Sequence, residues 1–481
     1  MTTHHPPNPS RWLALGALLL GEAMNLLDAT VVQVAAPAIH ADLGGAVSDV
    51  QWFGAAYTLP FAVLLVTGGR LGDILGRRRL FVTGVIGFTC ASVACAAAPA
   101  VGILIAFRAL QGAAAALVVP QTIGLIKAMF SGPEMSRALG GIGPVMGLAA
   151  VCGPVLGGVL THADLFGSSW RAVFVVNVPV AAAVLVLARG LPEDRAPVRP
   201  TLDVPGTLLA MTGTGLLVLP LIGSGLSSLS CATMATGAAV LVVFALHQRR
   251  LAAAGRTPLV EPGLFAQRAF PAALVASTAF FAVTNGLVTV VVLQLQPGLG
   301  VGVLASGLTL APWSCGLAVA SWAAGAHLVR RWGRRVMWAG LGVLLGGLCG
   351  AVTAYASTVP GTYPWALPLA LTVVGCGAGL FAPAFFTLAL APIRPQETGS
   401  AAGLLNAVQQ FGATVGVAVL GSVYLHGGEG AGASLRAAQG AFWAAAGLVG
   451  VALVASGAMG ERRPVRRLRP GGGWSRSSPR P

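Results

Sequence analysis

Two stretches of sequence decide the fold of this chain: GGRLGDILGRRR at residues 68–79 and AGAHLVRRWGRR at residues 324–335. Each follows a long apolar segment, ends in a cluster of arginines and leads into another apolar segment. The second echoes the first, as happens where one structural unit occurs twice in parallel order. The chain is therefore predicted to contain an internal repeat.

The apolar segments around these stretches read as membrane-spanning helices. The 481 residues are 56% hydrophobic and 9% charged, which is far outside the composition of soluble domains. An apolar stretch in lipid satisfies its own backbone as a helix of about 20 residues. Fourteen helices are predicted, at residues 12–36, 50–68, 80–98, 101–125, 139–161, 172–188, 205–223, 230–247, 270–293, 302–326, 336–356, 364–390, 400–424 and 438–458. The expected fold class is all-α integral membrane.

The basic residues lie almost entirely on one side of the predicted membrane. With a cytoplasmic N-terminus, 26 of the 29 lysines and arginines fall in cytoplasmic segments, two (Arg171 and Arg436) fall outside, and Arg108 lies within a helix. This split satisfies the positive-inside rule and predicts a multi-pass protein of the cell membrane with both termini cytoplasmic. The net charge of +15 therefore reflects topology, and nucleic acid is not an expected partner.

The echo also predicts how the helices are grouped. Eight helices separate the two stretches, which fits two six-helix bundles flanking an inserted pair. The first helix has no small-residue cleavage site, so we expect it to be retained as a span. The predicted regions are a cytoplasmic tail at 1–11, a first bundle at 12–188, an inserted pair with cytoplasmic connectors at 189–269, a second bundle at 270–459 and a basic cytoplasmic tail at 460–481.

The energy source is predicted from what the sequence lacks. The only lysine, Lys127, lies between Ile126 and Ala128 and cannot belong to a phosphate-binding P-loop. Uphill transport by this chain alone would draw on an ion gradient, with no cofactor. The seven cysteines have no metal-ligand spacing, and no nucleophile with a base is evident. We therefore expect that the protein has no metal site and is not an enzyme. We also expect it to work as a monomer.

Two acidic residues lie within a predicted span, and both are in the first helix. At about 100° per residue, Glu22, Asn25, Asp28 and Gln33 share a face roughly 140° wide. A carboxylate at mid-bilayer costs at least ~2.5 kcal/mol, so it normally faces a cavity and often carries a proton. Asp28 is the leading candidate for this role and Glu22 the second. The alternative for both is a structural carboxylate held by hydrogen bonds.

Other intramembrane polar residues are candidates for coupling or for lining a cavity. Arg108 shares a side of helix four with Gln111, and a buried arginine requires a carboxylate or carbonyl partner. Helix thirteen carries polar residues on one side, which are either cavity lining or interhelical contacts. The candidate substrate-cavity residues are Asn25, Gln33, Tyr57, Gln111, Asn406, Gln409 and Gln410.

Five segments together resemble the major facilitator superfamily, and in particular its fourteen-helix drug/proton antiporter branch of actinobacterial type. They are LDATVVQVAAP at 27–37, GRLGDILGRR at 69–78, FRALQGAAAA at 107–116, AAVCGPVLGG at 149–158 and WRAVFVVNVP at 170–179. The second is similar to the pattern GxxxDRxGRR, with Ile74 in place of a basic residue. The fourth is similar to the antiporter motif GxxxGPxxGG, with Ala149 for its first glycine.

The resemblance implies a function and roles for residues. It implies two six-helix bundles with two inserted helices, and exchange of small amphiphilic drugs or antibiotics for protons, with antibiotic resistance as the result. Asp28, Glu22 and Arg108 would couple protons to transport. The implied latch between the bundles is Gly69, Asp73, Gly76, Arg77 and Arg78, and the antiporter motif is Gly153, Pro154, Gly157 and Gly158. The remaining alternative is a proton-coupled symporter that imports a nutrient.

Overall fold

The computed structural model describes residues 10–164, 167–195, 201–222, 227–266, 268–394, 397–428 and 430–459. Within these ranges the chain is helical without a strand, and fourteen helical segments are long and apolar enough to cross a membrane. The predicted fold class and number of spans are confirmed. The predicted basic tail at 460–481 and most of the N-terminal tail lie outside the described residues.

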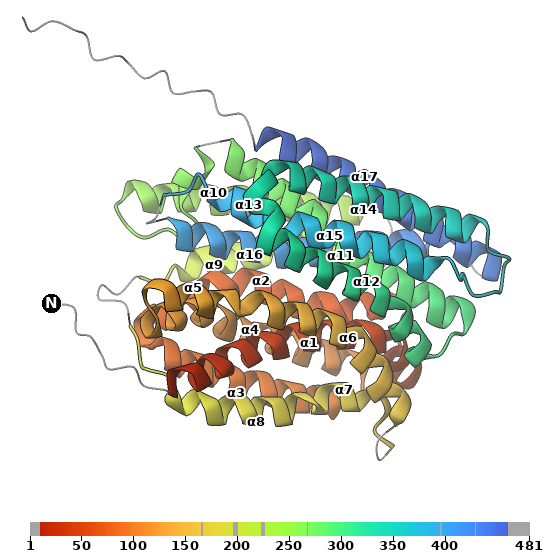
Figure 1. Ribbon diagram of the computed structural model, residues 1–481, viewed down its shortest axis with the longest axis horizontal. Helices are drawn as coiled ribbons and strands as arrows, with labels where there is room; N and C mark the ends of the chain where they lie inside the picture. The colour runs from red at the N-terminus through yellow and green to blue at the C-terminus, as the bar shows by residue number, and fades with distance from the viewer. Residues whose placement is uncertain are drawn as a thin grey trace, which may run out of the picture.

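The first half of the chain forms six of the spans, drawn from red to yellow in the lower part of Figure 1. Its helices are α1 (Ser10–Leu43), α2 (Asp49–Leu75), α3 (Arg77–Ala96), α4 (Val101–Met129), α5 (Gly132–Gly140), α6 (Ile142–Ala163), α7 (Ala172–Val175) and α8 (Asn177–Leu187). The end of α5 continues into α6 as one span, and α7 and α8 form another. Helix α1 runs past the predicted end at residue 36, because Pro37 removes one backbone donor without ending the helix.

The second half contributes eight spans. Its helices are α9 (Val204–Val218), α10 (Ser228–Ala253), α11 (Ala269–Leu299), α12 (Val303–Ala323), α13 (Val329–Trp332), α14 (Arg334–Ala356), α15 (Leu367–Leu390), α16 (Thr398–Leu425) and α17 (Ala431–Ala458). A π-helical turn at Ala324–Leu328 joins α12 to α13 within one span. The helices from α11 to α17 lie together in the upper part of Figure 1.

Each of the two similar stretches turns at a single glycine with a positive φ. In the first, α2 continues through Leu75 and α3 begins at Arg77, so that Gly76 alone separates them with a φ of 112°. In the second, Gly333 alone separates α13 from α14 with a φ of 48°. A positive φ is tolerated by glycine and strains other residues. The repeat inferred from the sequence therefore recurs in the backbone.

The two halves of the chain meet mainly along two contacts between helices. Helix α2 packs against α16, and the Thr58 and Thr414 hydroxyls hydrogen-bond across this contact with 2.6 Å between their oxygens. Helix α6 packs against α12. A Cβ atom on Gly307 of α12 would lie 2.5 Å from the Pro154 carbonyl oxygen of α6. Only a glycine at this position allows the two backbones to approach so closely.

The pair α9 and α10 packs beside the first of these contacts. Helix α9 touches both α2 and α16. The Thr67 and Thr207 hydroxyls of α2 and α9 are 2.9 Å apart, and the Ser422 hydroxyl of α16 donates to the Leu221 carbonyl at 2.7 Å. One turn further along α2, Arg70 donates to the carbonyls of Thr257 and Pro258. The pair is thus attached to both halves of the chain, while the boundaries given above for the five regions stay a prediction.

Asp203 anchors the start of α9. Its carboxylate accepts hydrogen bonds from the Gly206 amide at 2.9 Å and from Gln248 of α10 at 2.6 Å, and it pairs with His247 at 2.8 Å. Burial raises the pKa of Asp203, but the hydrogen bonds from His247, Gln248 and Gly206 outweigh burial and hold that pKa below its usual value. The ionised carboxylate therefore stabilises the junction between α9 and α10.

The stability of the protein is expected to fall in acid partly through Asp203. Because the pKa of Asp203 is lowered in the folded state, its contribution is complete above the unfolded-state value of about 3.9 and is lost as the pH falls through the lower folded-state value. The melting temperature of the purified protein should decrease below about pH 4. The decrease should be smaller in Asp203→Asn, and an equal decrease in both proteins would contradict this assignment.

Candidate functional site

The centre of the site is Asp28 on α1, a carboxylate that is 1% exposed. Arg108 of α4 donates to its Oδ2 atom at 2.5 Å. Gln111 of α4 and Asn177 of α8 donate to its Oδ1 atom at 2.9 Å and 2.8 Å. Three donors on two helices thus hold both oxygens of one buried carboxylate.

Arg108 is as deeply buried as its partner, and its Nε and NH1 groups are both hydrogen-bonded. Its Nε donates to the Phe53 carbonyl of α2 at 3.0 Å, and NH1 also donates to Gln111 Oε1 at 2.7 Å. The guanidinium lies over the Tyr57 ring, 4.4 Å from its centroid. Arg108 and Gln111 are three residues apart on α4, which places both on one face. The partner that a buried arginine requires is therefore Asp28.

Two members of this network were missed by sequence reasoning. Asn177 also donates to the Ser92 hydroxyl of α3 at 2.9 Å, and that hydroxyl donates to the Phe174 carbonyl at 2.9 Å. Both side chains are buried. The available signal was an amide in an otherwise apolar helix, within the segment WRAVFVVNVP at residues 170–179. A neutral residue gives no charge signal, so it was not singled out.

Glu22 and Asn25 lie nearer the N-terminus of α1 than Asp28, and both are half-buried. The hydroxyl of Tyr57 on α2 donates to the Asn25 side-chain oxygen. Glu22 lies close enough to Tyr57 for its charge to act on the Tyr57 hydroxyl. The structure therefore brings Glu22, Asn25 and Tyr57 together beside the Asp28 and Arg108 pair.

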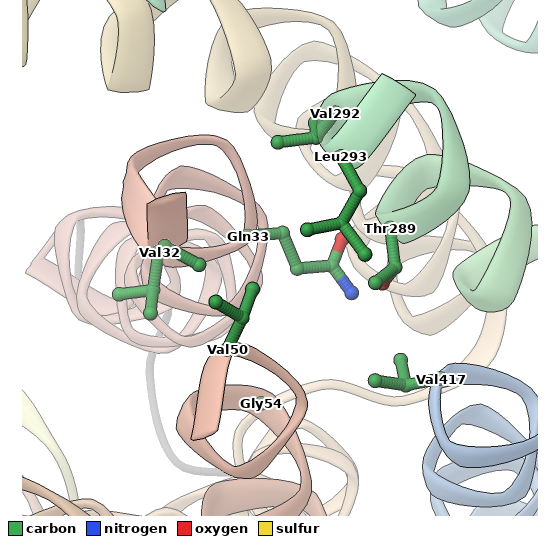
Figure 2. Close-up of a pocket in the computed structure, with 9 residues that line it drawn as sticks. Val32, Gln33, Val50, Gly54, Thr289, Val292, Leu293 and Val417 are labelled. Carbon is green, nitrogen blue, oxygen red and sulfur yellow. The ribbon is translucent and has the colours of Figure 1, made fainter. Parts of the chain in front are cut away.

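Gln33 is not part of this group. It lines a separate, small pocket between α1, α2, α11 and α16. Figure 2 shows its side chain extending from α1 toward Thr289 and Leu293 of α11. Five residues separate Asp28 from Gln33, which turns their side chains about 140° apart on a helix. The two side chains therefore lie at opposite edges of the 140° face predicted for α1: Asp28 faces the interior of the first half, whereas Gln33 faces the other half.

Helix α16 carries the candidate cavity residues Asn406, Gln409 and Gln410. All three are half-buried. Their side-chain amides form no hydrogen bond with any other residue that the structure describes. Half-buried amides are normally hydrogen-bonded, so these three groups are available to water or to a bound molecule.

The residues of the implied latch bind the connector that follows α8. Arg77 pairs with Asp73 at 2.8 Å and with Asp194 at 2.5 Å. Arg78 donates to the Arg189 carbonyl at 3.4 Å, and Gly69 faces Pro120 of α4. Among the described residues, no ion pair of this loop reaches the second half of the chain. In this structure the loop holds the connector at the end of the first half, and the latch between the bundles that the resemblance implies stays a prediction.

The segment that resembles the antiporter motif is a packing surface. A Cβ atom on Gly153 would collide with the Thr30 hydroxyl of α1, and one on Gly157 would lie 2.8 Å from the Val31 carbonyl oxygen. On the other side of α6, a Cβ atom on Gly158 would lie 3.0 Å from the Leu304 Cα atom of α12. These glycines, with Pro154, therefore hold α6 against both α1 and the second half.

Fourteen apolar spans, with a fully buried ion pair between α1 and α4, define a polytopic membrane protein. The family model described as Major Facilitator Superfamily matches residues 18–417. The chain belongs to this superfamily and is a membrane transporter rather than an enzyme.

The chain is similar to curated proteins of actinobacteria over most of its length. It is 45% identical to the "Probable actinorhodin transporter" of Streptomyces coelicolor, over 87% of this chain and 73% of that one. It is 35% identical to a puromycin resistance protein of Streptomyces alboniger, over 87% of this chain and 82% of that one. These names confirm the predicted resemblance to antibiotic exporters.

One solved structure shows the shared fold. A bacterial homologue of the human lysosomal transporter Spinster, in an inward-facing and unoccupied conformation, superposes with a TM-score of 0.65. The match covers 94% of this chain and 97% of that one at 18% sequence identity.

Proposed function

We propose that this transporter exports small amphiphilic compounds, antibiotics among them, in exchange for protons, and so confers antibiotic resistance. The observation that carries the proton-coupled part is Asp28, a fully buried carboxylate paired with an arginine in the membrane interior. The direction of transport is supported by the relatives, whose names describe antibiotic transport and resistance.

The ion pair supplies a mechanism for coupling. Protonation of Asp28 removes the charge that Arg108 neutralises, so the contact holding α1 to α4 weakens. A proton that reaches Asp28 from outside the cell would in this way allow the protein to leave one conformation. Loss of the proton to the cytoplasm would restore the ion pair between Asp28 and Arg108. Glu22, Asn25 and Tyr57 lie beside the pair, where bound cargo would sense its charge. The bundles would rock between the two states, while the glycines of α6 exclude water from the contact with α12.

The topology and energy source complete the proposal. The charge distribution supports a cell-membrane location with both termini cytoplasmic. The proton gradient would be the only energy source, without a cofactor. Cargo, protons and the bilayer would be the only partners of a monomer.

The test is transport in everted membrane vesicles with an acidic interior. Ethidium, a flat cationic dye, should accumulate inside and release protons as it enters, and a protonophore should abolish both. Asp28→Asn keeps the shape of the side chain and one acceptor for Arg108, and it should reduce proton release to that of vesicles without the transporter. Asp49→Asn, at the start of α2, is the control for loss of one carboxylate. Undiminished coupling in Asp28→Asn, or dye leaving the vesicles with protons, would refute proton-coupled export.

A further inference from the structure

The surroundings of Asp28 match only its charged form. Arg108 donates to one carboxylate oxygen, and Gln111 and Asn177 both donate to the other. A protonated carboxyl group is itself a donor and needs an acceptor. Proton binding at this site therefore requires that one of the three surrounding groups change from donor to acceptor.

Arg108 and Gln111 cannot make that change. A guanidinium has no acceptor. The acceptor of Gln111, its Oε1 atom, already takes a hydrogen bond from Arg108 NH1 at 2.7 Å. Turning the Gln111 amide would place its NH₂ group against the guanidinium, so that two donors would face each other.

Asn177 can make the change, and Ser92 is placed to assist it. At present Asn177 Nδ2 donates to Asp28 at 2.8 Å and to the Ser92 hydroxyl at 2.9 Å. A half-turn of the amide would bring its oxygen to both positions. The Ser92 hydroxyl, which now donates to the Phe174 carbonyl, could rotate to donate to Asn177. The two lone pairs of the amide oxygen would then accept from the protonated Asp28 and from Ser92.

We propose that Asn177, together with Ser92, is the positioning residue for proton transfer at Asp28, and that its amide reverses each time Asp28 binds or loses a proton. This inference rests on the proposed function, since it explains how a closed site can hold both forms of the carboxyl group. The titratable groups around Asp28 are Arg108 from α4, Tyr57 from α2, Cys95 from α3 and Glu22 from α1. Asn177 and Ser92 are neutral, so replacing them changes no charge in this set.

The test is infrared difference spectroscopy of the full-length transporter in lipid as a function of pH. The carboxyl band that is present in the wild type and absent in Asp28→Asn reports the protonation of Asp28. In Asn177→Leu the midpoint of this band should move to higher pH by about one unit, a tenfold change, because a hydrogen bond to a charged group is about twice as strong as one to a neutral group. An unchanged midpoint in Asn177→Leu would overturn the proposal.

Ser92→Ala separates the reversing amide from a fixed donor. The present orientation then leaves one hydrogen of Asn177 with no acceptor, whereas in the reversed orientation the amide oxygen loses Ser92 but still accepts from the protonated Asp28. An unsatisfied buried donor costs more than an unused lone pair on a bonded oxygen, so the reversed orientation and the protonated Asp28 become relatively more favourable. The midpoint should again move to higher pH, by less than in Asn177→Leu. A fixed donor predicts no shift, and a wild-type midpoint in Ser92→Ala would overturn the reversal. This variant decides the question even where Asn177→Leu does not fold.

Thr89→Val is the matched control. Thr89 lies one turn from Ser92 on α3, and its hydroxyl donates to the Val85 carbonyl of its own helix at 2.7 Å. Its removal should leave the midpoint unchanged. The failure of the inference and the failure of the proposed function can be distinguished. The absence of an Asp28 band in the wild type would refute the role of Asp28 in proton binding. An Asp28 band whose midpoint is unchanged in the Asn177 and Ser92 variants would refute only the inference about the amide.

Discussion

The variant Arg108→Leu should lose about 3–5 kcal/mol of folding free energy, because it leaves the Asp28 charge buried without a partner. Asp28 is 1% exposed and receives its shortest hydrogen bond, 2.5 Å, from Arg108. The substitution also removes the donor to the Phe53 carbonyl and the cation above the Tyr57 ring. We expect little monodisperse protein in size-exclusion chromatography and no resistance in a pump-deficient host.

Two further variants test whether the effect of Arg108→Leu comes from the unpaired charge of Asp28. Lys127→Leu removes one positive charge from an exposed position on the same helix and should leave the melting temperature close to that of the wild type. In the double variant Asp28→Asn/Arg108→Leu no charge is left unpaired, so folding should recover in part while proton-coupled export does not. A stable single Arg108→Leu variant would show that the ion pair is not needed to hold α1 and α4 together.

The second large effect is expected at Gly112→Val, one turn from Arg108 on α4. A Cβ atom at Gly112 would overlap the backbone carbonyl of Tyr57 on α2, and a backbone atom cannot rotate away. Overpacking of this kind costs typically 1–3 kcal/mol and occasionally more. We expect the upper end of that range or beyond, because separating α2 from α4 also moves Arg108 away from the Phe53 carbonyl that it contacts.

Gly102→Val supplies the comparison on the same helix. No heavy atom outside its own neighbourhood lies within 4 Å of a Cβ atom built there. This variant should give wild-type expression and melting, whereas Gly112→Val should give aggregated protein. Equal behaviour of the two glycine variants would contradict the close packing of α2 on α4.

The fold could be predicted from the sequence because each span carries its own signal. An apolar run of about 20 residues needs no knowledge of its neighbours, and the arginines after residues 68 and 324 mark the repeat. The partner of Arg108 could not be predicted in this way. Asp28 lies 80 positions earlier in the chain, and only the packing of α1 on α4 brings the two together.

Other parts of the site show the same limit. A helical wheel gives angles between side chains, but it does not say which neighbour occupies each direction, so Gln33 was grouped with Asp28. The resemblance implied what the loop at residues 69–78 does in its family, but the partner of Arg77 in this conformation is Asp194 of the connector. Asn177 carries no charge and was found only by following the hydrogen bonds of Asp28.

The attachment of α9 to both halves has a consequence for protein engineering. A twelve-span version made by excising α9 and α10 would leave the Thr67 and Ser422 hydroxyls without the groups they now contact. Acyl chains would replace those groups, and acyl chains offer no hydrogen bonds. A minimal pump would therefore need valine and alanine at these two positions before it could be expected to insert and fold.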